Sequence, residues 1–190
     1  MSKELRWRVL ILQAIVAAVF AVGALIAFKE ARFTRDYVHD QLAAQKISFP
    51  QAGAANFKPE DYPELQQYAG QKVDDGEKAQ AYANGYIGRH LTTTAEGRTY
   101  SEQSTYARQN PGDAKAQDAV QTLFRGETLR GMLLNAWGWW TIGTYTFYAG
   151  FALALATVGV LGAFAFELVM TPRRRHAASR VAVQGTLTTR

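Results

Sequence analysis

VLILQAIVAAVFAVGALIAF, from Val9 to Phe28, is the stretch that decides the fold. The run carries no charged residue, and Gln13 is its only polar side chain. An α-helix needs about 20 apolar residues, at about 1.5 Å per residue, to cross roughly 30 Å of hydrocarbon. The stretch therefore predicts a first transmembrane helix.

Basic residues precede this run, with a tryptophan among them: Lys3, Arg6, Trp7 and Arg8. Positive charge favours the cytoplasmic side, and tryptophan favours the lipid headgroup layer, so we expect a cytoplasmic N-terminus. A cleaved signal peptide is the alternative, with small residues Val22 and Ala24 at a suitable spacing. The apolar run continues to Phe28, beyond a typical signal core, which favours a retained span.

A second apolar run predicts a return crossing. It extends from Phe147 to Met170 with Glu167 as its only charge, and an aromatic cluster precedes it: Trp137, Trp139, Trp140 and Tyr145. Pro172 is expected to end the helix. The arginines that follow, Arg173, Arg174 and Arg175, predict a cytoplasmic C-terminus. Glu167 lies close to these arginines, so we expect it to pair with Arg173 or Arg174 rather than to relay protons.

These two runs predict an all-α membrane protein with two transmembrane helices flanking a small helical extracytoplasmic region. The predicted segments are a cytoplasmic N-tail over 1–8, the first span over 9–28, the extracytoplasmic region over 29–136, an interfacial aromatic segment with the second span over 137–171, and a basic cytoplasmic tail over 172–190. Both termini are expected in the cytoplasm of a plasma-membrane protein.

Charge and cysteine content narrow the possible functions. The net charge is +5, but acidic residues slightly outnumber basic ones between 29 and 135, so the excess lies in the tails. Nucleic-acid binding needs clustered charge on a folded face, and we expect none. The chain has no cysteine, which excludes disulfides, thiolate metal sites and cysteine nucleophiles.

Small residues recur at four-residue spacing in both spans, which is typical of helices that pack closely in lipid. The packing candidates are Ala17 and Ala21 in the first span, and Ala152, Ala156, Gly159 and Ala163 in the second. Either the two spans pack on each other, or one such face is left for the helices of a partner.

The outer region reads as several short helices and no sheet. The helical period of the first span continues to about Gln45, and Pro50 favours an extended backbone before it. Asp74 with Glu77, and Thr99 with Glu102, resemble capping boxes at helix starts. Asp113 can cap a further helix, and Gly126 is expected to mark a bend. We also expect a short helix over 64–69 and a disordered tail after Arg180.

The sequence contains few candidate residues for metal binding or catalysis. Asp36, His39 and Asp40 share one helix face and, with His90, form a weak candidate for a metal site. The alternative is a solvated face with charge pairs such as Arg32 and Asp36. The chain lacks a phosphate loop, a nucleophile elbow and zinc-ligand spacing, so we expect no catalytic residues and no cofactor. Within the aromatic cluster, a bound lipid or quinone is the alternative to simple anchoring at the bilayer surface.

Four phrases resemble a group of small, mostly actinobacterial membrane proteins of uncharacterised function. They are DQLAAQKISFP from Asp40, AYANGYIGRHL from Ala81, GRTYSEQS from Gly97 and LFRGETLRGMLLNAWGWWTIG from Leu123. The resemblance implies two spans around an outer helical region, and it carries no catalytic residues.

The leading functional hypothesis is a non-catalytic accessory or scaffold subunit of a larger plasma-membrane assembly, with an energy-converting complex as one candidate. Its expected partners are the lipid bilayer and other membrane-protein subunits. The first alternative is an extracytoplasmic module that binds lipid, quinone or cell-wall material, which predicts an apolar pocket between the outer helices and the Trp137 to Tyr145 cluster. The second is a metal-dependent membrane enzyme.

Overall fold

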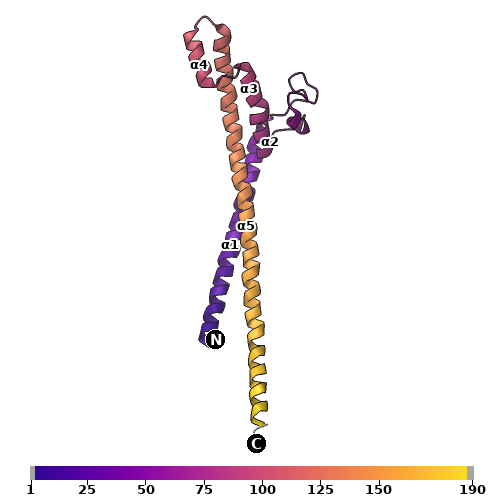
Figure 1. The fold of residues 1–190 in the computed structure, drawn as a ribbon, viewed down its shortest axis with the longest axis vertical. Helices are drawn as coiled ribbons and strands as arrows, with labels where there is room; N and C mark the ends of the chain where they lie inside the picture. The colour runs from indigo at the N-terminus through magenta and orange to yellow at the C-terminus, as the bar shows by residue number, and fades with distance from the viewer. Residues whose placement is uncertain (1–2, 188–190) are drawn as a thin grey trace. The chain divides into compact units, whose positions relative to one another are not determined.

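The computed structural model describes the backbone of residues 3–187 and the side chains of residues 3–169. Its elements, in chain order, are α1 (Lys3–Gln45), the 3-10 helix η1 (Pro63–Tyr68), α2 (Gly76–Gln80), the π-helix η2 (Ala81–Ile87), α3 (Gly88–Thr94), α4 (Tyr100–Gln109) and α5 (Ala114–Leu187) (Figure 1). The described residues form no strand, only one isolated antiparallel bridge between Ser48 and Lys72. The chain divides into two compact units, residues 1–30 with 146–190, and residues 31–145.

Both long helices are long and apolar enough to cross a membrane. Only 17% of the most apolar stretch of α1, and none of that of α5, is buried within the chain. The core helix of a soluble protein would be mostly buried, and these two stretches are not.

Within the first unit, the two helices make contact through small residues. A Cβ built on Gly150 would lie 3.1 Å from both the Ala27 Cβ and a Phe28 ring carbon. Phe28 also packs on Phe147, with ring centroids 5.4 Å apart. At the other end, the Arg6 guanidinium donates to the backbone oxygen of Glu167 at 3.4 Å. The expected pairing of the Glu167 carboxylate with Arg173 or Arg174 stays a prediction, because the side chains of both arginines lie outside the described residues.

Buried positions along α1 repeat every seven residues: Leu10, Ala17, Ala24, Ala31 and Val38. Gly143 and Gly150 have the same spacing in α5. A seven-residue repeat is the spacing of a left-handed coiled coil, and small side chains at the repeat let the backbones approach closely. Of the predicted packing residues, Ala17 is buried and Ala21 and Ala156 are half-buried, whereas Ala152, Gly159 and Ala163 are exposed.

The second unit has a core of aromatic and aliphatic side chains. Phe57, Val73 and Leu123 are its largest fully buried members. Phe49 stacks on Tyr68 and meets Tyr82 edge-on, with centroids 5.2 and 5.0 Å away. Offset and edge-to-face ring pairs add about 0.5–1.5 kcal/mol each beyond their buried area. Phe49 follows the turn after α1, so it ties that turn to η1 and η2.

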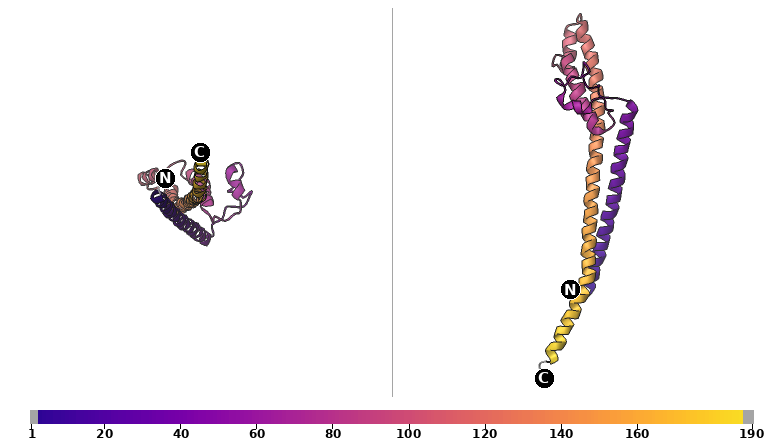
Figure 2. Two further views of the ribbon diagram at one scale, coloured as in Figure 1. Left: turned by 90° about the horizontal axis from the view of Figure 1, so that it is seen from below. Right: turned by 90° about the vertical axis from the view of Figure 1, so that its right-hand side faces the viewer.

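Helix α4 and the beginning of α5 lie side by side, as Figure 2 shows. Gln103 donates to the Ala116 oxygen at 3.2 Å, and Gln117 donates to the Ala107 oxygen at 2.9 Å. The predicted capping box of α4 is confirmed, because Thr99 and Glu102 bond reciprocally. The Asp113 side chain accepts from the Ala116 N–H at 3.0 Å, as a cap should.

Several predictions about helix boundaries were wrong. The N-cap of α2 is Asp75, not Asp74. Gly126 does not bend the chain, because α5 runs through it, and Pro172 does not end the helix, because α5 continues to Leu187. The helix covers 181–187 of the tail that was expected to be disordered, and 188–190 lie outside the described residues. At Gly126 a Cβ would collide with the buried Leu91 side chain, so this glycine allows α3 to approach α5.

Candidate functional site

The residues of the metal hypothesis are not brought together. Asp36 forms an exposed ion pair with Arg32 at 3.5 Å. The Nδ1 atom of His39 lies 2.8 Å from the Asp74 backbone oxygen, while His90 lies on α3. Among the residues that the structure describes, no three His, Asp or Glu side chains converge on a point. These four positions therefore offer no preformed metal site.

A polar hollow lies beside the π-helix η2. Its volume is about 710 Å³, and it is lined by Asn56, Asp61, Tyr62, Asn84, Gly88, Arg89, His90, Thr92, Thr93 and Arg130. The lining comes from the loop before η1, from η2 and α3, and from α5. A π-helix within a helical run is often found at functional sites.

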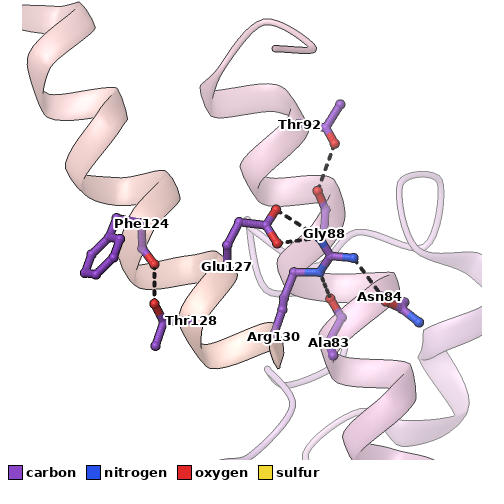
Figure 3. Close-up of polar contacts among 8 residues, drawn as sticks. All are labelled: Ala83, Asn84, Gly88, Thr92, Phe124, Glu127, Thr128 and Arg130. Carbon is purple, nitrogen blue, oxygen red and sulfur yellow. Dashed lines mark hydrogen bonds and ion pairs between the residues drawn. The ribbon is translucent and has the colours of Figure 1, made fainter. Parts of the chain in front are cut away.

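Arg130 joins α5 to the π-helix, as Figure 3 shows. Its guanidinium pairs with both oxygens of Glu127, at 2.9 and 2.8 Å. It also donates to the Ala83 oxygen at 3.1 Å and to Oδ1 of Asn84 at 3.1 Å. The Ala83 oxygen accepts the Gly88 N–H as well, which is the wide turn of a π-helix. Arg130 is thus engaged on every side by groups of the chain.

Arg89 is engaged in the same way. It donates to the Asp61 backbone oxygen, pairs with Glu64, and lies 5.5 Å from the centre of the Tyr62 ring. Both cations of the hollow are therefore neutralised within the chain. Their arrangement ties the loop before η1 and the π-helix together, and it leaves no free positive charge for an anion.

The tyrosines beneath this hollow are poor acids and bases. Burial raises the pKa of Tyr82, and burial together with Tyr62 raises the pKa of Tyr86. Both phenols thus stay protonated at neutral pH, and the Tyr86 oxygen accepts from Nδ2 of Asn56 at 2.8 Å. The polar hollow holds no nucleophile beside a base, and its geometry fits a structural junction.

A second depression, which we name the apolar groove, lies between residues 33–45 of α1 and residues 129–139 of α5. Its volume is about 480 Å³, within the range of about 300–1,000 Å³ that ligand sites have. It is lined by Phe33, Thr34, Tyr37, Val38, Gln41, Leu42, Gln45, Ile47, Leu129, Met132, Leu133, Asn135, Ala136 and Trp139. Phe33, Met132 and Trp139 are 62%, 66% and 54% exposed, so its rim is apolar and open.

The polar groups of the apolar groove are all uncharged. They are the hydroxyls of Thr34 and Tyr37 and the amides of Gln41, Gln45 and Asn135, and no acid or base lines it. These three amides form no hydrogen bond with another described residue. Their donors are therefore open to a ligand.

The aromatic cluster is split between two environments. Trp139 lines the apolar groove, whereas Trp140 lies beneath Arg35 and against Gly76, where a Cβ would collide with its side chain. Trp137 is half-buried, and Tyr145 and Trp7 are exposed. The sequence placed these four aromatic residues in one cluster and gave no sign that Trp139 alone lines the groove.

Comparisons with protein-family models, with curated proteins and with solved structures found no match.

Proposed function

We propose that the chain is a two-span plasma-membrane protein with cytoplasmic termini, and that residues 29–136 lie outside. The unburied apolar stretches of α1 and α5 support the spans. Orientation follows from the basic residues that flank them, Lys3, Arg6 and Arg8 at one end and Arg173 to Arg175 at the other. Since the chain has no cysteine, single cysteines at Ser2 and at Lys58 provide a direct test. An impermeant thiol reagent applied to intact cells should label only the cysteine at position 58.

Within this membrane setting, the chain acts as a non-catalytic accessory or scaffold subunit of a larger assembly. One observation carries this proposal: α5 presents a small-residue face that α1 does not cover. Ala152, Gly159 and Ala163 are exposed, and a Cβ on Gly159 or Gly162 would meet nothing within 4 Å. In lipid, small-residue faces are where helices pack, because close van der Waals contact drives their association.

Substitution at this open face tests the scaffold proposal. Gly159→Leu has room within the chain, so the two-helix packing should survive while association with a partner is lost. Val158→Leu, at a neighbouring exposed position, is the matched control. Purification from native membranes in mild detergent, followed by mass spectrometry, should recover the same partner with the wild type and Val158→Leu but not with Gly159→Leu. Recovery of the chain alone in every case would overturn the proposal.

A second candidate function is supported by the apolar groove. The hypothesis of an outer module for lipid, quinone or cell-wall material predicted an apolar pocket near the Trp137 to Tyr145 cluster. The groove has Trp139 in one wall and the outer part of α1 in the other. This arrangement favours an apolar ligand over cell-wall material, whose recognition would require polar walls.

A further inference from the structure

The chemistry of the apolar groove restricts what can occupy it. Its walls carry aromatic and aliphatic side chains with three open amides, and none of its lining residues is charged. A phosphate or ammonium head group would find no counter-charge among these residues, so the lining gives it no electrostatic advantage over water. The occupant therefore has an apolar body and an uncharged head that accepts hydrogen bonds.

The distance along α1 between the predicted span and the groove determines how long the bound molecule must be. Phe28 ends the predicted span, and Gln41 lies thirteen residues further along the same helix, about 20 Å at 1.5 Å per residue. Phe33, Tyr37 and Val38 line the groove between these levels. A long single chain can bridge this distance and keep its far end in hydrocarbon, whereas a short two-chain lipid would have to leave the bilayer.

The lining of the groove continues past the end of α1. Helix α1 ends at Gln45, and Lys46 takes a left-handed conformation with a φ of 54°. Ile47, just after this turn, belongs to the lining and also packs against the core of the unit. The groove lining therefore combines the Gln45 amide with an aliphatic side chain at the end of α1.

We propose that the apolar groove binds the head and first isoprene units of a prenyl quinone from the membrane. The amides of Gln41, Gln45 and Asn135 donate to the quinone oxygens. Phe33, Tyr37 and Trp139 contact the ring and the prenyl chain. This inference rests on the membrane spans of the proposed function but not on the partner subunit, so the two can fail separately.

Binding of a long-chain menaquinone to the purified full chain tests this proposal. The chain is reconstituted into phosphatidylcholine nanodiscs, and quenching of tryptophan fluorescence is followed as menaquinone is added. We expect saturable quenching that excess prenyl phosphate of the same chain length does not displace. Flotation with the nanodiscs is measured first, because a chain that does not insert would contradict the spans rather than the quinone site.

Two variants and one control locate the site. Ala136→Phe fills the groove and should weaken binding at least about tenfold, whereas Gly131→Phe, on an open part of α5, should leave it unchanged. The double variant Gln41→Leu with Asn135→Leu changes only exposed positions, so folding should be retained. It should weaken menaquinone binding but leave binding of the corresponding prenol nearly unchanged.

Three results would overturn the proposal. They are unsaturable quenching that is equal in all variants, equal displacement by prenyl phosphate, and disulfide-linked dimers of Met132→Cys in the same nanodiscs. The last result would show that a second copy covers the groove. Weaker binding in Ala136→Phe alone, with the Gln41 and Asn135 pair unaffected, would contradict the assigned role of the amides.

Discussion

The guanidinium carbon of Arg35 lies 4.5 Å from the centre of the Trp140 ring. Gly76, at the start of α2, contacts the same tryptophan so closely that it has no room for a Cβ. Trp140 therefore joins α1, α2 and α5 within the second unit. An indole expected to anchor at the bilayer surface is used as an internal packing element.

Loss of this tryptophan should destabilise the second unit. Trp140→Ala removes contacts to two helices, and we expect a loss of about 2–3 kcal/mol in the free energy of unfolding, less than for a fully buried tryptophan. Arg35→Ala should cost about 0.5–1 kcal/mol, as expected for an exposed cation–π contact. Trypsin susceptibility of the outer region against temperature measures both. Trp139→Ala is the control, and an equal effect there would contradict the internal role of Trp140.

Two glycines of α5 should respond oppositely to the same change. Gly131→Ala should stabilise the helix by about 0.5–1 kcal/mol, because the added methyl meets nothing and alanine is the better helix former. Gly126→Ala should destabilise the unit by about 1–2 kcal/mol, because Leu91 is buried and cannot move aside freely. Thermal unfolding of both variants in detergent compares them. A stabilising Gly126→Ala would show that the contact with α3 is loose.

The ion pair of Asp74 and Lys78 should make stability pH-dependent. The hydrogen bond from Lys78 lowers the pKa of Asp74, and the same bond raises the pKa of Lys78. The contribution of Asp74 is present above its unfolded pKa of about 3.9 and is lost as the pH falls through the lower folded value. The contribution of Lys78 to stability is present below about pH 10.4 and is lost as the pH rises through its raised folded pKa.

Asp74→Asn should therefore lower stability at neutral pH and flatten the acid limb of the stability profile. Unfolding temperatures measured from about pH 2 to about pH 7 should show the effect, because this range covers both the unfolded pKa of Asp74 and its lower folded pKa. Asp40→Asn, at an exposed position, serves as control and should leave the profile unchanged. An unaltered acid limb in Asp74→Asn would mean that the pair contributes nothing.

The cap of α4 should be a local determinant of stability. Thr99→Ala removes the side-chain oxygen that accepts from the Glu102 N–H, and we expect a loss of about 1 kcal/mol. Hydrogen exchange of the amides in α4 should rise, while exchange in α1 stays the same. Thr99→Ser keeps the hydroxyl and should behave as the wild type.

Sequence reasoning was most successful where local chemistry decides the structure. The end of α1 at Gln45 and the box of Thr99 and Glu102 depend on neighbouring residues alone. Gly126 shows why contacts between distant parts of the chain could not be predicted. Its role is set by Leu91, which is remote in sequence, so the residue was mistaken for a bend.

The apolar groove was foreseen only in outline. Phe33, Tyr37, Val38 and Leu42 recur at helical spacing on one side of α1, but Val38 and Leu42 are buried whereas Phe33 and Tyr37 are exposed. The division depends on where α5 lies across that face. No pattern within α1 carries that information. The one signal that the sequence offers is a row at four-residue spacing, in which the aromatics Phe33 and Tyr37 are followed by the amides Gln41 and Gln45.

The π-helix from Ala81 to Ile87 closes its hydrogen bonds over five residues, where an α-helix uses four. Its wide turn accommodates one extra residue, so deletion of a single residue there should restore an ordinary α-helix and leave the helix after it in nearly the same orientation. Leu91 would then stay against Gly126, but the Ala83 carbonyl that Arg130 binds would be enclosed by a narrower turn. The extra residue therefore serves the contact between Arg130 and the backbone, and a one-residue deletion should weaken that contact without unfolding the unit.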